Sequence, residues 1–215
     1  METETRLKYP RTFHLPWSES VGGDDHMLSP AILATWKGRR VIVTEKRDGE
    51  NTTMYANHIH ARSLDSCRQN HPSRDWVKQF WGTIRHTIPP QWRICGENMF
   101  AKHSIAYENL ETYFEGFSLW EGKTCFAWDE TLFWFEMLGI KPVPVLYDGP
   151  FDEKLIRGLW TPDQASTVEG YVVRDAEDIA YDDFNTKVAK FVRKNHVATD
   201  QHWMFAEIVK NKLKE

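Results

Sequence analysis

The chain has 215 residues, of which 41 % are hydrophobic and 27 % charged, and such a composition is typical of one large globular domain or two small ones. Its formal net charge of −4 excludes a strongly basic chain, so any binding of nucleic acid must come from a local patch of cations. Three cysteines without metal-type spacing argue against a disulfide framework, and the chain contains neither an apolar signal region nor ~18 consecutive apolar residues, so we expect a cytoplasmic protein with no membrane partner.

Residues 1–30 are rich in Pro, Ser, Gly and Asp, which predicts an extended N-terminal arm packed on the core. The segment 10–18 mixes basic and aromatic residues, so it fits either a contact with nucleic acid or an anchor, and anchoring is the commoner role of aromatic residues in extended segments. The acidic pairs Asp24-Asp25 and Asp182-Asp183 are expected to be solvated turn residues.

Residues 31–215 are predicted to form one domain, because no linker, repeat or low-complexity segment divides them. Runs of β-branched, aromatic and apolar residues predict short strands at 41–46, 52–57, 58–63, 93–98, 113–120, 140–146, 168–174 and 188–192. Apolar residues at helical spacing predict helices from Ser73 to the Pro89-Pro90 pair and at 129–138, 152–159 and 199–213. Many short strands, mostly antiparallel, with helices outside them indicate an α+β fold.

Lys46 ends the first of these strands and is followed by Asp48-Gly49. A free lysine amine has a pKa near ~10.4 and is protonated at neutral pH. Burial or nearby cations would lower that pKa and allow the amine to act as a nucleophile. Asp-Gly is also common in hairpin turns, so this motif alone fits an ordinary turn as well as a covalent site.

Further charged residues lie inside apolar strand patterns, where an unpaired charge would be costly. Glu97 and Glu169 each lie beside a glycine, which would let a ligand approach the backbone, while Lys187 and Lys190 flank Val188-Ala189. Each glutamate taken alone fits a surface position or a structural ion pair. Together with Lys46, however, they provide an amine, two carboxylates for metal or sugar, and cations for phosphates, as transfer at an α-phosphate requires.

The order of these motifs resembles motifs I, Ia, III, IIIa, IV and V of the covalent nucleotidyltransferase superfamily, which contains ATP-dependent DNA and RNA ligases and mRNA-capping guanylyltransferases. The corresponding segments are Lys46-x-Asp48-Gly49-x-Asn51, Arg62-Ser63, Gly96-Glu97-Asn98, Tyr113 to Trp120, Glu169 to Val173, and Lys187 to Arg193. The asparagine that closes motif I is more similar to RNA ligases of the RNA-ligase-2 branch than to capping enzymes or most DNA ligases. The resemblance covers about residues 40–195 and implies an ATP-grasp-like ligase adenylation domain.

The resemblance implies an ATP-dependent RNA ligase that acts in RNA repair. Lys46 would form lysyl-AMP from ATP and pass AMP to an RNA 5′-phosphate, and an RNA 3′-hydroxyl would then displace AMP, with Mg²⁺ or Mn²⁺ as cofactor. A minimal DNA ligase or another covalent nucleotidyltransferase is the alternative enzyme. A non-catalytic protein that binds RNA ends is the alternative outside catalysis.

The resemblance also assigns roles to individual residues. The implied catalytic residues are Lys46, Asp48, Asn51, Glu169, Lys187 and Lys190. The implied ATP-binding residues are Glu45, Lys46, Arg62, Glu97, Phe117, Glu169, Lys187, Lys190 and Arg193. Phe117 would stack on adenine, Glu97 would bind the ribose, and Glu169 would hold the metal directly or through water, with Glu97 as a lesser candidate.

The chain departs from the family pattern in two places. Motif V usually has two lysines separated by one residue, whereas Lys187 and Lys190 are three apart and Val192 occupies the position of a second lysine. The second cation is therefore either Lys187 or Arg193. The few residues after motif V predict that the chain lacks a C-terminal OB-fold.

Overall fold

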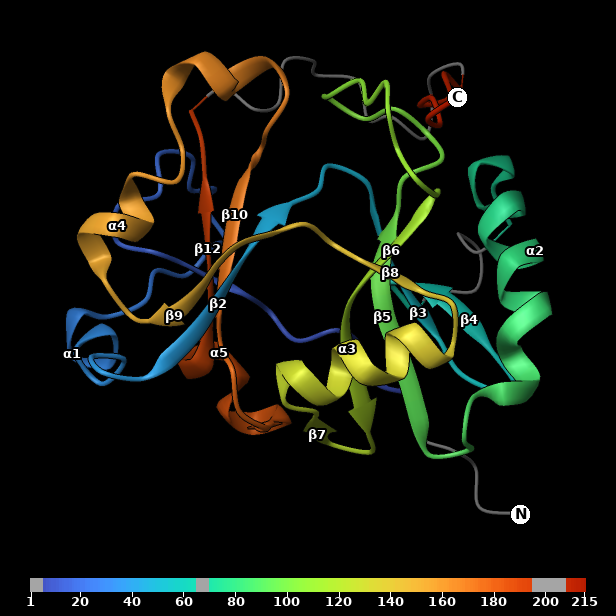
Figure 1. Ribbon diagram of the computed structural model, residues 1–215, viewed down its shortest axis with the longest axis horizontal. Coiled ribbons are helices and arrows are strands. Elements are labelled where there is room, and N and C mark those ends of the chain that lie inside the picture. Colours follow the sequence, from blue (N-terminus) through green and yellow to red (C-terminus); the bar gives the residue numbers. More distant parts are fainter. Residues whose placement is uncertain (1–5, 65–69, 195–207) are drawn as a thin grey trace.

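Two β-sheets stand side by side in the computed structural model, which describes residues 6–64, 70–194 and 208–215 (Figure 1). The first sheet has the strand order β1-β12-β10-β2-β9. Its strands are β1 (Phe13–His14), β12 (Val188–Val192), β10 (Gly170–Asp175), β2 (Arg40–Lys46) and β9 (Val145–Pro150). The predicted α+β class, with mainly antiparallel strands flanked by helices, is confirmed.

The second sheet has the order β11-β7-β6-β5-β3-β4, with β8 paired to β6. These strands are β11 (Ile179–Ala180), β7 (Thr124–Cys125), β6 (Phe114–Glu121), β5 (Trp92–Asn98), β3 (Glu50–Met54), β4 (Ile59–Ala61) and β8 (Lys141–Pro142). Helix α2 (Asp75–Ile84) lies along this sheet and α3 (Trp128–Met137) crosses near its lower end, whereas α1 (Pro30–Ala34) and α4 (Glu153–Arg157) lie beside the first sheet (Figure 1). None of the described helices is both long and apolar enough to cross a membrane.

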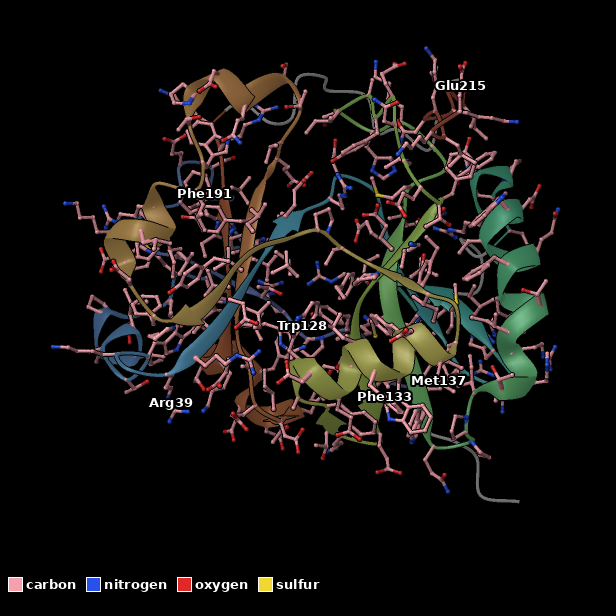
Figure 2. The ribbon with its side chains drawn as sticks, in the orientation of Figure 1. Arg39, Trp128, Phe133, Met137, Phe191 and Glu215 are labelled. Atoms are coloured by element: carbon pink, nitrogen blue, oxygen red, sulfur yellow. The ribbon has the colours of Figure 1, made fainter. Side chains whose placement is uncertain are left out.

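Apolar clusters lie on each sheet, and two smaller clusters join residues of both sheets. Leu15 and Leu28 of the N-terminal arm are fully buried against Val43 and Val173 of the first sheet. Their burial, together with the pairing of β1 and β12, makes the arm a structural part of that sheet. Helix α3 buries Phe135 against the second sheet and Trp128 in a cluster with Ile42 of the first sheet, while Phe133 and Met137 point outward from the same helix (Figure 2).

The chain passes from one sheet to the other at Asp48-Gly49. Strand β2 pairs with β10 and β9, whereas β3 pairs with β4 and β5. The two strands are therefore not partners, and the hairpin alternative for this Asp-Gly pair is wrong. Its turn is instead the point where the backbone leaves the first sheet, and Lys46 ends β2 directly before it.

The strand predicted at 140–146 is two strands in different sheets. Residues Lys141–Pro142 pair with β6, and β9 begins at Val145 and pairs with β2. The prolines at 142 and 144 have no N–H for a continuous ladder, so the chain changes sheets between them. The local pattern of apolar residues does not reveal this change of partner.

The end of the chain differs from the helix predicted at 199–213. Residues 199–207 lie outside the described residues, and residues 208–213 are not helical. They form instead an extended C-terminal strap (residues 208–215) that runs along the loop 99–113, with bridges Ala101↔Lys210 and Leu110↔Leu213. The buried Asn211 fastens it, since its Nδ2 donates to the Met99 carbonyl at 2.7 Å and its Oδ1 accepts from Tyr107 N at 3.0 Å.

Replacing Asn211 by Ala should lower the free energy of unfolding by about 1–3 kcal/mol, because buried backbone groups of loop 99–113 lose their partners. Urea denaturation followed by tryptophan fluorescence measures this change. Lys214→Ala, at an exposed position of the same strap, is the matched control and should change stability by less than about 0.5 kcal/mol. Equal effects of the two substitutions would contradict a fastening role for Asn211.

Candidate active site

A pocket of about 300 Å³ lies between the two sheets, and seven of the residues predicted to form a site line it. They come from β2, β3, the residue directly after β4, β5, β6 and β12. These residues are Glu45, Lys46, Asn51, Arg62, Glu97, Phe117 and Lys190.

The Lys46 amine lies 2.7 Å from Oε2 of Glu169, the residue directly before β10. Gly170 pairs with Lys46 across the antiparallel β2 and β10, which brings these two side chains together although 123 residues separate them in the sequence. Burial alone would lower the pKa of Lys46, but Glu169 and Glu97 outweigh it and hold the pKa above its ordinary value. The expectation of a lowered pKa is therefore wrong, because carboxylates rather than cations face the amine.

Glu97 enters the pocket from the second sheet. Its Oε1 accepts a hydrogen bond from Gly49 N at 3.2 Å, so the carboxylate also fixes the turn after Lys46. Burial raises the pKa of Glu97 to about 8, and the nearby Glu169 adds to the rise while Lys46 opposes it. Two carboxylates thus share one lysine, and one of them is easily protonated.

Asp48 does not line the pocket but holds the turn from the opposite side. Its Oδ2 accepts hydrogen bonds from the N–H groups of Ser104 and Ile105, both at 2.7 Å. Its own N–H donates to the Tyr107 hydroxyl at 3.0 Å. Loop 99–113 therefore braces the lysine turn, and the C-terminal strap braces that loop in turn.

Glu45 and Arg47 form an ion-paired wall of the pocket. The guanidinium of Arg47 donates to Glu45 at 2.7 Å and to Glu115 at 2.6 Å, and it lies over the ring of Tyr107. Burial raises the pKa of Glu45, although Arg47 opposes this. Glu45 lies at the pocket as expected, with its carboxylate already paired.

Of the three cations predicted for motif V, only Lys190 lines the pocket. Lys187 lies in α5 (Phe184–Lys187), and its amine donates to Asp175 at 3.1 Å. The Arg193 guanidinium donates to the carbonyls of Val168 and Lys194 and stays outside the pocket lining. Side chains alternate between the two faces of a strand, and this alternation directs Lys190 of β12 into the pocket. Lys187 is the last residue of α5 and precedes β12, so the alternation does not apply to it.

Part of the pocket lining is aromatic or apolar, and it includes Tyr9, Trp128, Val143 and Val172, which were not identified from the sequence. Phe117 faces Val172 and Val143 in this lining, and Tyr9 of the arm packs edge-on against Phe117 with ring centroids 5.1 Å apart. Trp128, labelled between the sheets in Figure 2, lies beneath the Arg174 guanidinium at 5.5 Å. These aromatic and aliphatic side chains suit a flat aromatic ring. Residues 170, 172 and 174 share one face of a strand, and this alternation could have indicated from the sequence that Val172 and Arg174 line the site.

The carboxylates at Lys46 fit a divalent cation only with help from other oxygens. Among residues 6–64, 70–194 and 208–215, no three His, Cys, Asp or Glu side chains form a group able to hold a metal. Glu169 and Glu97 are hard oxygen donors of the kind that Mg²⁺ and Mn²⁺ prefer. Their donor set is compatible with a divalent cation whose remaining ligands are other oxygens, such as water.

Comparison with known proteins identifies a family and a fold. Residues 39–192 match the family model described as RNA ligase. A mutant RNA ligase of Naegleria gruberi, solved with ATP and Mn, superposes with a TM-score of 0.52 at 20 % identity over 80 % of this chain and 54 % of that one. An archaeal ATP-dependent RNA ligase superposes with a TM-score of 0.56 at 19 % identity over 86 % of this chain and 48 % of that one.

These similar structures are distant in sequence and longer than this chain. At about one residue in five identical, the likeness shows the fold alone. The chain spans about half the length of each of these two ligases. A search of curated proteins found no match.

Proposed function

The chain belongs to the RNA ligase family, and from this premise we propose that it is an ATP-dependent RNA ligase that joins RNA 5′-phosphate and 3′-hydroxyl ends through lysyl-AMP. One observation carries the proposal most strongly. Lys46, Glu97 and Lys190 line one pocket together with the aromatic Phe117, and Glu169 binds the Lys46 amine there. This arrangement supports ATP with its base against Phe117 and its phosphates beside Lys46 and Lys190.

In the first step, the neutral Lys46 amine attacks the α-phosphorus of ATP. An N–P bond forms, the bond between the α-phosphorus and the bridging oxygen breaks, and pyrophosphate leaves with that oxygen. Lys190 would balance negative charge on the phosphates, and Glu97 would hold ribose hydroxyls. Mg²⁺ or Mn²⁺, held mainly by Glu169 directly or through water, would offset phosphate charge and weaken the hold of the carboxylates on the amine proton.

In the later steps, AMP passes to the RNA 5′-phosphate and is displaced by a 3′-hydroxyl. Asn51 supports a role with these ends, because its Oδ1 is buried at the pocket and has no hydrogen-bond partner among the described residues. A hydroxyl donor from the polynucleotide would satisfy it. Arg62 lines the same pocket and supplies a cation for a 5′-phosphate. We further propose that the protein acts in RNA repair in the cytoplasm.

Covalent labelling tests the first step. The protein is incubated with Mg²⁺ and ATP labelled at the α-phosphate, denatured and separated by electrophoresis, and we expect a labelled protein band. A parallel reaction with α-labelled GTP tests for a capping-type enzyme, and nicked RNA and nicked DNA substrates test which polynucleotide is joined. Binding of RNA ends without any labelling would replace the proposal with a non-catalytic protein.

The labelling rate should increase with pH between about 6 and 8, by up to roughly tenfold per unit, because the pKa of Lys46 is raised and only its neutral form attacks. The rate increases rather than decreases with pH because the carboxylates Glu169 and Glu97 stabilise the Lys46 ammonium. The neutral fraction of Lys46 therefore stays small until the pH approaches the pKa of Lys46. Rates measured with ATP far below saturation report the ionisation of the free protein. A profile that is flat over this range would contradict the assigned protonation of Lys46.

A further inference from the structure

The N-terminal arm brings an acidic side chain to the phosphate end of the pocket. Asp25 lines the pocket, and its Oδ1 lies 3.5 Å from the Lys190 amine. Its other carboxylate oxygen, Oδ2, lies 3.1 Å from Nε2 of His14. Asp25 lies in a turn and is about one third exposed, as expected in part, but its carboxylate is paired rather than solvated alone, whereas its neighbour Asp24 is exposed as expected.

The backbone fixes Asp25 in this place. Strand β1 runs parallel to β12, with His14 opposite Lys190. The backbone of His14 also binds the next part of the arm. His14 N donates to the His26 carbonyl and Leu28 N donates to the His14 carbonyl, both at 2.7 Å. The Asp25 turn is closed by Asp25 N donating to the Gly22 carbonyl and by Gly22 N donating to Asp25 Oδ2. Asp25 is thus held on the same strand pair that carries Lys190.

A buried chain of polar groups supports the carboxylate from behind. His14 is 1 % exposed, and its Nδ1 lies 2.7 Å from Oγ of Ser18. Ser18 Oγ accepts a hydrogen bond from Val192 N on β12 at 3.0 Å. Burial and Lys190 both lower the pKa of His14, so the imidazole is neutral at physiological pH, and its Nε2 lies beside the Asp25 carboxylate. The network starts and ends on β12, at Val192 and at Lys190.

Asp25 is the carboxylate that acts most strongly on Lys190. Burial lowers the pKa of Lys190, and the cations Lys46 on β2 and Arg62 after β4 lower it further. Asp25 opposes them, while the neutral His14 adds no charge. The carboxylates Glu97 and Glu169 act on Lys46 instead. Among the described residues, Asp25 therefore has the largest share in keeping Lys190 charged and in place.

We propose that Asp25 is a positioning residue for adenylation, which holds the Lys190 ammonium at the phosphate end of the pocket and so makes the N-terminal arm part of the active site. This inference rests on the proposed function, because it gives Lys190 the task of binding phosphates. A lysine chain has many rotamers, and an ion pair that selects one of them removes the cost of ordering it when the phosphates react.

The substitution Asp25→Asn tests the proposal, since it keeps the shape and removes the charge. We expect the rate constant for labelling with α-labelled ATP to fall about tenfold at saturating ATP. The ATP concentration that gives half the maximal rate should not increase, because a carboxylate that repels phosphate is lost at the same time. The decline of activity at high pH should move to lower pH, because Lys190 loses its proton more easily without Asp25.

Three comparisons separate positioning from simple structural damage. Asp24→Asn removes the same charge from the neighbouring exposed position and should leave the rate and the pH profile unchanged. Asp25→Glu should restore most of the rate. In a Lys190→Ala background, Asp25→Asn should change the rate by less than about twofold, because its effect passes through Lys190.

Two results would overturn the proposal: a pH profile of Asp25→Asn that superimposes on that of the unsubstituted protein, or equal effects of Asp25→Asn with and without Lys190. Failure of the proposed function looks different, because the unsubstituted protein would then take up no label at all. Thermal unfolding of Asp25→Asn, compared with Asp24→Asn, shows whether folding is intact.

Discussion

Replacing Lys46 by Ala should abolish covalent labelling by α-labelled ATP, with a loss of at least roughly 10³-fold. The reason is chemical: the substitution removes the only amine that Glu169 and Glu97 both hold at the pocket, and no other described lysine shares that environment. Lys190 lines the same pocket but pairs with Asp25. Labelling is measured in single-turnover reactions by electrophoresis after denaturation.

The same variant separates a lost nucleophile from a damaged fold. RNA that already carries AMP on its 5′ end does not need Lys46 as a nucleophile, so Lys46→Ala should still seal such ends in the presence of Mg²⁺. Lys154→Ala, on the exposed surface of α4, is the matched lysine control and should be labelled normally. Undiminished labelling of Lys46→Ala would refute the assignment of the nucleophile.

Replacing Gly170 by Ala should destabilise the protein by roughly 3 kcal/mol or more. Gly170 has φ of +157°, and a Cβ at this position would lie 2.0 Å from the Phe191 carbonyl oxygen on the paired strand β12. That oxygen belongs to the backbone, so β10 and β12 would have to separate. Glu169 directly precedes the glycine, and labelling should therefore be lost together with stability. Urea denaturation and the labelling assay measure the two effects.

Gly82→Ala provides the matched control. Gly82 lies in α2, where an added Cβ meets no atom within 4 Å, and a helix favours Ala over Gly by roughly 0.5–1 kcal/mol. The same chemical change should thus raise stability at Gly82 and lower it at Gly170. If Gly170→Ala unfolds at the urea concentration of the unsubstituted protein, the close approach of β10 and β12 is not required.

The residues of the site were more predictable from the sequence than their electrostatics. Lys46 was identified by the Asp-Gly that follows it at the end of an apolar strand, and Glu97 and Glu169 because each interrupts an apolar strand pattern. Strand pairing then brings Lys46 and Glu169 to one place. The raised pKa of Lys46 was not predictable in this way, because it depends on which charges the fold brings close. Close packing, and not only the approach of a ligand, also explains a glycine beside a glutamate. A Cβ added at Gly96 would clash with Phe114 and Glu115.

The predictions that were wrong or missing concern residues whose surroundings are set by segments far away in the sequence. Lys187 and Lys190 look equivalent in sequence, but a short helix ends between them, and only Lys190 reaches the pocket. Asp25 resembles a solvated turn residue because the neighbouring glycines and Asp24 dominate the local pattern. The parallel pairing of β1 with β12, which carries Asp25 to Lys190, joins the two ends of the domain and leaves no trace in either segment alone.

The long separation between Lys46 and its partner has a consequence for biosynthesis. The ion pair joins residues 123 positions apart, and the strand that carries Lys190 comes later still. Contacts of such sequence separation form slowly, because a long loop must close before they contribute stability. A chain emerging from the ribosome therefore cannot assemble this site until nearly the whole domain has been synthesised, and ATP cannot bind there to assist the folding of a partial chain.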